Sequence, residues 1–128
     1  MPANLYRMIM PVPDVERAAA FYRNVLDLPG EPVAGGSRHY FRCGGTILAL
    51  ANPGEHGVDF RPNVDHVYFA VADLQAAYRR AEAAGAEELD AEIATQPWGE
   101  RSFYCRDPFG NPICFVDEGT LFTGESAS

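Results

Sequence analysis

The sequence predicts an α+β fold built from two tandem βαβββ modules, and three observations support this. An apolar run that ends at Asp14 returns later as a run that ends at Asp73, with Val12 and Val71 at matching positions. A pattern typical of an amphipathic helix follows each aspartate. Short runs rich in β-branched and aromatic residues follow each helix, separated by Gly and Pro turns. We therefore expect each module to contain one strand, one helix and then three further strands.

The length and composition suit one domain. The chain has 128 residues, of which 47% are hydrophobic and 22% charged, so it can build a core. We expect a single domain over 1–128, with module one at about 5–54, a polar linker at 55–63, module two at about 64–118 and a frayed tail at 119–128. One module alone buries too little of its sheet, so two should pack together or with a partner chain.

The first module begins with a strand that starts at Arg7. Asp14 is a good N-cap for a helix that runs from about Val15 to Leu26. The helix has a core-facing stripe with three-and-four spacing and is ended by Pro29 and Gly30. Three strands are expected after it, at Glu31–Ala34, Ser37–Cys43 and Thr46–Ala51. The stripe consists of Val15, Ala18, Ala19, Phe21, Tyr22, Val25 and Leu26.

The second module repeats this order. Its first strand starts at His66, Asp73 caps a helix from Leu74 to about Ala84, and Gly85 ends that helix. Leu74, Ala77, Tyr78 and Ala81 are expected to face the core. The strands that follow are expected at Glu87–Ile93, Arg101–Arg106 and Pro112–Asp117. A turn over 107–111 should join the last two, because Pro fixes φ and Gly allows a positive φ there.

Charge and cysteine content exclude several classes of protein. The formal net charge is -8, and every cation is an arginine, so no clustered cationic face for nucleic acid is expected. No apolar run approaches bilayer length, and no signal peptide is seen at the start. The cysteines (Cys43, Cys105 and Cys114) show neither a disulfide framework nor zinc-ligand spacing. These features predict a cytoplasmic protein without a membrane partner, whose thiols stay reduced.

The chain resembles the vicinal oxygen chelate superfamily, which includes glyoxalase I, extradiol dioxygenases, thiol transferases and bleomycin-resistance proteins. The resemblance covers about 5–118 and is carried by Val12-Pro13-Asp14 with Phe21-Tyr22, by 66–73, and by 98–111. The last segment, with its WG-x-R-x-F and DP-x-GN motifs, is most similar to the bleomycin-resistance group. The resemblance implies two βαβββ modules whose sheets curl around a ligand cleft, commonly in a homodimer.

The resemblance also implies a divalent metal, held by the first and the last strand of each module. The matching positions in this sequence are Arg7, Ala49, His66 and Cys114. Arginine has no lone pair to donate and alanine has no donor atom, so only the imidazole and a less usual thiolate remain. We therefore expect no metal and no other cofactor. His66 and Cys114 would be the ligands only if a metal were found, and the pair would favour zinc or copper.

Six residues are candidates for ligand binding: Arg7, His66, Tyr68, Trp98, Ser102 and Tyr104. Period-two alternation places Arg7 on one face with Ile9, and Tyr68 on one face with His66. The resemblance implies that Ser102 and Tyr104 line the pocket. Trp98 stands beside a glycine turn, where its indole could cover an aromatic or cationic ligand.

Each candidate has a structural alternative. Arg7 could pair with Glu100 at a subunit interface, and His66 could be a hydrogen-bonded core histidine. The tyrosines could be ordinary half-buried aromatics, and Trp98 could close the end of a sheet. Cys114 is expected to be a small core residue rather than a nucleophile. His39 and His56 have no evident partner and are expected at the surface.

Three functions remain open. The first is a homodimer that binds a small hydrophobic or cationic molecule, antibiotic-like, without turnover. The second is a lyase, isomerase, thiol transferase or dioxygenase that uses a divalent metal, or that uses His66 as a general base with Tyr104 beside it and Arg7 to stabilise an oxyanion. The third is a partner or regulatory module whose cleft is vestigial. The sequence does not identify the ligand.

Overall fold

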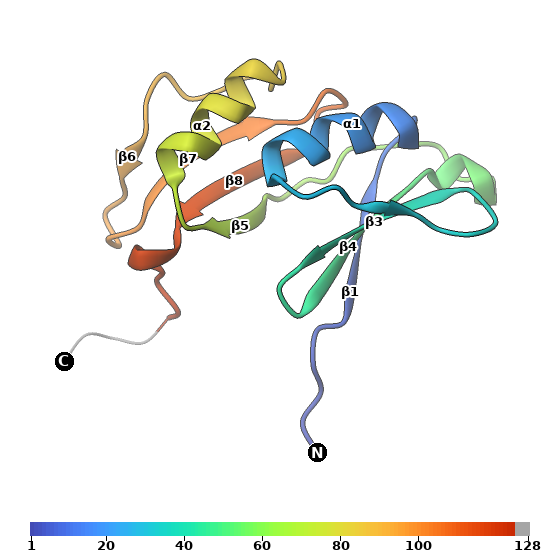
Figure 1. Ribbon diagram of the computed structural model, residues 1–128, viewed down its shortest axis with the longest axis horizontal. Helices are drawn as coiled ribbons and strands as arrows, with labels where there is room; N and C mark the ends of the chain where they lie inside the picture. Colours follow the sequence, from blue (N-terminus) through green and yellow to red (C-terminus); the bar gives the residue numbers. More distant parts are fainter. Residues whose placement is uncertain (125–128) are drawn as a thin grey trace. The chain divides into compact units, whose positions relative to one another are not determined.

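The computed structural model describes residues 1–124 and divides into two compact units, Met1–Asn63 and Val64–Ser128 (Figure 1). Each unit contains one helix and one four-stranded mixed sheet. Over the described part of the chain, no helix is both long and apolar enough to cross a membrane. The expected α+β fold with two tandem βαβββ modules is confirmed.

The first unit places β1 (Arg7–Pro11), α1 (Val15–Leu26), β2 (Glu31–Pro32), β3 (Arg38–Cys43) and β4 (Thr46–Ala51) in chain order. The strand order in the sheet is β1-β4-β3-β2. The pair β1–β4 is parallel, with Ile9 opposite Ala49, and the other pairs are antiparallel. A short 3-10 helix, η1 (Pro53–His56), follows β4.

The second unit has the same topology. It consists of β5 (Val67–Val71), α2 (Leu74–Ala83), β6 (Ala94–Thr95), β7 (Arg101–Arg106) and β8 (Pro112–Asp117), in the order β5-β8-β7-β6. The strands β5 and β8 are parallel, as β1 and β4 are in the first unit. A 3-10 helix, η2 (Glu118–Thr120), follows β8.

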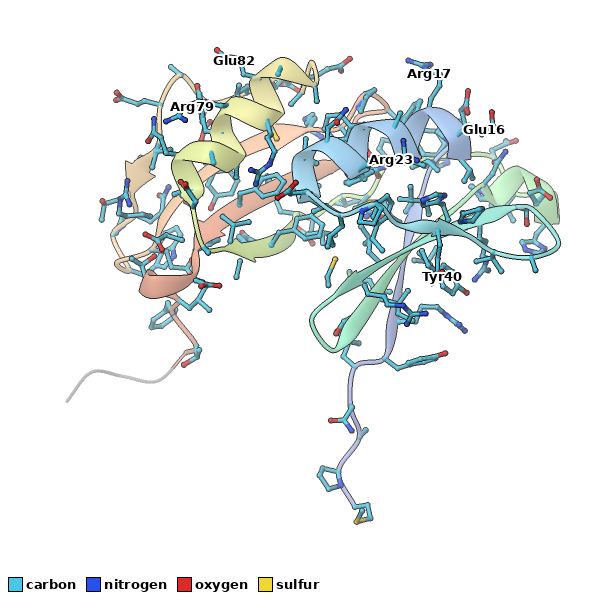
Figure 2. The ribbon with its side chains drawn as sticks, in the orientation of Figure 1. Glu16, Arg17, Arg23, Tyr40, Arg79 and Glu82 are labelled. Carbon is cyan, nitrogen blue, oxygen red and sulfur yellow. The ribbon has the colours of Figure 1, made fainter. Side chains whose placement is uncertain are left out.

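Both helices begin at the predicted aspartates. The Asp14 carboxylate accepts a hydrogen bond from the backbone N–H of Arg17 at 3.1 Å, and that of Asp73 accepts one from Ala76 at 3.0 Å. Each bond satisfies an N–H group that the first helical turn leaves without a backbone partner. In Figure 2 the charged side chains of Arg17 on α1 and Glu82 on α2 lie on the side of the helix away from its sheet.

The hydrophobic core of each unit lies between its helix and the covered face of its sheet. The predicted stripe of α1 is buried except at its two ends, Val15 and Leu26, which are half-buried. In α2, Tyr78 is also half-buried, and its ring packs edge-on against Phe103 at 5.0 Å. Phe103 and Phe115 are stacked at 5.2 Å and form the centre of the second core.

The predicted strand at Glu87–Ile93 is wrong. Glu88 has a positive φ of 46°, which breaks an extended run, and only Glu87 forms a bridge, to Arg106. Asp90 then pairs with Tyr104 on β7 in two ways: its backbone N–H donates to the Tyr104 carbonyl at 3.0 Å, and its carboxylate accepts the N–H of Tyr104 at 2.9 Å. The strand β6 forms only after this loop. The strand predicted at Glu31–Ala34 is likewise shorter and ends at Pro32.

The expected surface position of His39 is also wrong, since the residue is only 7% exposed. Strand alternation places it on the covered face of β3, opposite Leu50 and beside Phe41. A histidine without an evident partner is expected at the surface, but the position of His39 on the covered face of β3 buries it. Its Nε2 atom has no hydrogen-bond partner among the described residues. His56, in contrast, is exposed as expected.

Candidate functional site

The candidate site lies on the open face of the second sheet, which α2 does not cover. Along β5 the exposed residues Tyr68 and Ala70 alternate with buried residues that pack toward the helix. The strand register sets Tyr68 opposite Cys114 on β8, and Cys114 opposite Tyr104 on β7. These three side chains therefore form one row across the open face.

His66 lies immediately before β5 and joins two of the row's side chains in an aromatic cluster. Its ring is 4.9 Å from that of Tyr104, edge-on, and 6.1 Å from that of Tyr68. The two tyrosine rings are 6.3 Å apart and nearly perpendicular. Edge-to-face contacts of this kind hold rings in defined orientations. The structure thus brings together three of the predicted site residues.

Next to this cluster is a pocket of about 400 Å³, which lies entirely within the second unit. A volume of this size is within the range of sites for small molecules. Its walls are mainly apolar and aromatic, and they contain one carboxylate. The lining residues are Tyr68, Phe69, Ala70, Trp98, Glu100, Val116, Leu121 and Phe122.

Glu100 connects two walls of the pocket. One carboxylate oxygen accepts the Trp98 indole N–H at 2.8 Å, and the other accepts the backbone N–H of Phe122 at 3.0 Å. These bonds hold both aromatic residues at the pocket, although Trp98 remains 46% exposed. The carboxylate lies at the N–H edge of the indole and gives the pocket a negative charge, and an aromatic ring with a nearby negative charge suits a cation.

Sequence reasoning missed most of this wall. Glu100 was considered only as a partner for Arg7, and the segment after Glu118 was expected to fray. Instead, Thr120 accepts the N–H of Arg101 at 3.0 Å, and Phe122 is bound to Glu100. The apolar pair Leu121 and Phe122 in an otherwise small and polar segment was the signal that could have identified the wall.

The remaining predicted residues lie outside the pocket. Ser102 is buried on the open face of β7, and its hydroxyl oxygen is 3.2 Å from Nε2 of Gln96, which donates to it. Arg7 belongs to the first unit, where it donates to the Tyr40 hydroxyl at 3.2 Å. Ser102 therefore binds Gln96 rather than lining the pocket, and Arg7 lies on the sheet of the first unit.

Burial raises the pKa of two groups in this row, the Tyr104 phenol and the Cys114 thiol. Burial raises the pKa of the Tyr104 phenol, and a hydrogen bond with Tyr68 raises it further. Burial also raises the pKa of the Cys114 thiol to about 12. Near neutral pH the phenol is a hydrogen-bond donor and the thiol is neutral, so Cys114 is neither a ready nucleophile nor a ready metal ligand.

This protonation predicts a loss of stability in alkali. Burial raises the pKa of Cys105 and of Cys114 to about 12, whereas an unfolded cysteine ionises near about 8.5. A raised folded pKa stabilises the fold below the unfolded value, and this contribution is lost as pH rises toward the folded value. Each thiol contributes about 1.4 kcal/mol per pH unit, so we expect the parent to lose about 2 to 3 kcal/mol more per pH unit above pH 9 than a Cys105→Ala, Cys114→Ala double variant.

Urea unfolding from pH 8 to pH 11 under reducing conditions measures this difference. The double variant is less stable at pH 8 because it lacks two buried side chains, so the test compares the slopes with pH rather than the absolute stabilities. Parallel slopes for the two proteins would contradict the assignment.

The residues at the positions where the resemblance implies metal ligands do not fit a metal. Arg7 carries a guanidinium and Ala49 only a methyl group, and the Cys114 thiol is buried and protonated. His66 alone keeps an ordinary donor. Within residues 1–124, no three His, Cys, Asp or Glu side chains lie close enough together to form a metal-binding group. We derive no chemistry through a metal ion.

Comparisons with known proteins find a matching family model and a related sequence over most of the chain. Residues 5–115 match the model of the Glyoxalase/Bleomycin resistance protein/Dioxygenase superfamily. The chain is 32% identical over 124 residues to the metallothiol transferase FosB of Shouchella clausii (strain KSM-K16), and the match covers 94% of this chain and 84% of that protein.

Solved structures show the same fold. A lactoylglutathione lyase from Agrobacterium tumefaciens is similar with a TM-score of 0.67 and 26% identity, over 91% of this chain and 94% of that one. A glyoxalase/bleomycin resistance protein/dioxygenase from Nocardioides is similar with a TM-score of 0.70 and 21% identity, over 100% of this chain and 90% of that one.

Proposed function

Because the chain belongs to the Glyoxalase/Bleomycin resistance protein/Dioxygenase superfamily, we propose that it binds a small hydrophobic or cationic molecule, antibiotic-like in character, without a metal. The observation that carries this proposal is the pocket of the second unit, where Tyr68, Trp98 and Phe122 surround the Glu100 carboxylate. Aromatic faces and one fixed negative charge attract an organic cation and offer little to an anion.

The donor set supports the metal-free part of the proposal. Two of the positions that hold metal in the superfamily carry Arg7 and Ala49, which provide no ligand. Element analysis of the purified protein measures this directly. A transition ion at stoichiometric occupancy that is lost in a His66→Ala variant would overturn the proposal.

The sole tryptophan provides the binding assay, since Trp98 lines the pocket and reports its occupancy by fluorescence. We expect benzyltrimethylammonium to quench this emission more strongly and at lower concentration than benzyl alcohol or benzoate. A Glu100→Gln variant removes the charge and keeps one of the two acceptor oxygens, so it should bind the cation about five- to tenfold more weakly, as measured by calorimetry.

Glu118→Gln is the matched control, because it removes an exposed carboxylate that does not line the pocket. It should leave the affinity for the cation unchanged. Equal weakening by the two variants would show that the effect comes from net charge rather than from the pocket, and equal affinity for cation and anion would contradict the proposal.

An enzyme is the second candidate, and one contact favours it. His66 is exposed, its ring touches that of Tyr104, and the raised pKa keeps that phenol protonated. An imidazole base beside a phenol donor suits proton transfer at a bound substrate. The names of two relatives, a metallothiol transferase and a lactoylglutathione lyase, are also those of enzymes. Turnover that is lost in His66→Gln while binding persists would support this candidate over pure binding.

The assembly and location are part of the proposal. We infer a homodimer, because the edge strand β1 and the residues before it expose the apolar side chains of Leu5, Met8 and Ile9. A reducing cytoplasm fits the three cysteines, all of which are free thiols.

A further inference from the structure

We propose that the open face of the first sheet is a second ligand site, which binds the oxyanion of a small organic acid at Arg7. This inference goes beyond the proposed function, because it concerns the other unit and a ligand of the opposite charge. It rests on the position of the Arg7 guanidinium, on the aromatic rings around it and on the charges of the surrounding face.

Two tyrosine rings hold the guanidinium in place. Nη1 of Arg7 donates to the Tyr40 hydroxyl at 3.2 Å, and the Cζ atom lies 5.1 Å from the centroid of Tyr6 and 5.8 Å from that of Tyr40. Arginine has five N–H donors in a fixed fork, and among residues 1–124 only the Tyr40 hydroxyl accepts a hydrogen bond from Arg7. The other donors are oriented but available, which lowers the entropy cost of binding an anion.

The residue before β1 is fixed as firmly as the strand itself. The backbone oxygen of Tyr6 accepts the N–H of Ile47 at 2.9 Å, and the backbone oxygen of Leu5 accepts the hydroxyl of Thr46 at 2.9 Å. These bonds continue the β1–β4 pairing beyond Arg7 toward the N-terminus. These bonds fix the backbone of Tyr6, a residue that is 62% exposed and whose ring lies beside the guanidinium.

The strand register shows which other residues share the open face of the first sheet with Arg7. Arg7 is opposite Ile47, which is opposite Arg42 on β3, while Tyr40 is opposite both Ala49 and Glu31. Figure 2 shows Tyr40 on the side of the sheet away from α1. Ile47 and Ala49 are both buried, so they form an apolar floor beside the guanidinium.

The charges on this face leave Arg7 without an acidic partner. Glu31 forms an ion pair with Arg42 at 3.0 Å. Arg38, two residues before Tyr40 on β3, lies on the same face by strand alternation. In the described part of the chain, no carboxylate forms an ion pair with Arg7. A chain with a net charge of -8 thus keeps a locally positive surface here. The ligand that fits is a carboxylate or phosphonate attached to an aromatic or apolar group, because the rings can pack against that group.

NMR titration with phenylphosphonate tests this site, and it reads the Arg7 side-chain Nε–H signal and the backbone amides of Tyr40 and Ile47. We expect these signals to shift together with one dissociation constant. Arg7→Met should weaken binding at least about tenfold, and Arg7→Lys by less, because lysine keeps the charge but loses the fork.

Arg42→Met is the matched control, since it removes an arginine from the same face that already pairs with Glu31. It should change the affinity less than twofold. Arg7 is exposed, so circular dichroism and thermal unfolding should show Arg7→Met folded like the parent.

The opposite outcomes of these experiments would contradict the proposal. Unshifted Arg7 Nε–H, or equal losses in Arg7→Met and Arg42→Met, would overturn it. Inorganic phosphate that binds as tightly as phenylphosphonate would overturn the organic-acid assignment, because the rings would then contribute nothing. The cation assay at Trp98 does not depend on Arg7, so failure of either proposal is recognised separately.

Discussion

Asp107→Ala is expected to destabilise the protein by about 3 to 5 kcal/mol. The Asp107 side chain is fully buried in the turn between β7 and β8. Its carboxylate accepts three hydrogen bonds at 2.9 Å, from the backbone N–H of Phe109, from the backbone N–H of Asn111 and from the Asn111 side-chain amide. Alanine would leave these buried donors without an acceptor, and each such group costs about 1 to 3 kcal/mol.

Urea unfolding followed by circular dichroism measures the loss. Asp107→Asn is the control, because it keeps one acceptor oxygen in nearly the same volume and should lose about half as much. A loss below about 1 kcal/mol for the alanine variant would show that water or a shift of the turn replaces the carboxylate. Domains of this size are stable by only about 5 to 15 kcal/mol, so the expected loss is a large fraction of the total.

Gly30→Ala is expected to cost about 2 to 4 kcal/mol for two separate reasons. Gly30 has a φ of +62°, which favours glycine. A Cβ atom there would lie 2.6 Å from Nε2 of His39 and 2.6 Å from Cε1 of Phe41. Both rings are buried in the first core and have little room to move.

Gly44→Ala separates the two reasons. Gly44 has the same φ of +62°, but an added Cβ would meet no atom within 4 Å. This variant should lose only the backbone contribution, about 1 kcal/mol. The difference between the two variants in thermal or urea unfolding therefore measures the steric contact with His39 and Phe41. Equal losses would contradict the close packing at Gly30.

The regular parts of the fold were predictable because their signals are local. Asp14 and Asp73 each combine a capping carboxylate with the apolar spacing of the helix that follows, and α1 begins and ends as predicted. The strands of the central pairs, β4, β7 and β8, also have the predicted bounds. In these segments the side-chain pattern and the backbone preference agree.

The errors arose where a distant partner decides the local structure. The Asp90 carboxylate accepts the hydrogen bond from the Tyr104 N–H that a strand carbonyl would otherwise accept. No periodic pattern in the sequence indicates this contact. Leu121 and Phe122 become a pocket wall through Glu100. Alternation predicts that His66 and Tyr68 share a face, but the contact of both with Tyr104 and the pocket itself depend on segments that are far apart along the chain.

The parallel pairing of the first and last strand in each unit has a consequence for synthesis on the ribosome. β1 leaves the ribosome early, but its partner β4 ends only at Ala51. The first sheet can therefore be completed only after that residue has emerged. β5 must likewise wait for β8, which ends at Asp117. A nascent chain that stops shortly before Pro112 carries a complete first sheet, but in the second unit β5 and β7 both lack β8, the strand that lies between them. Their unpaired backbone groups are then exposed to chaperones and proteases.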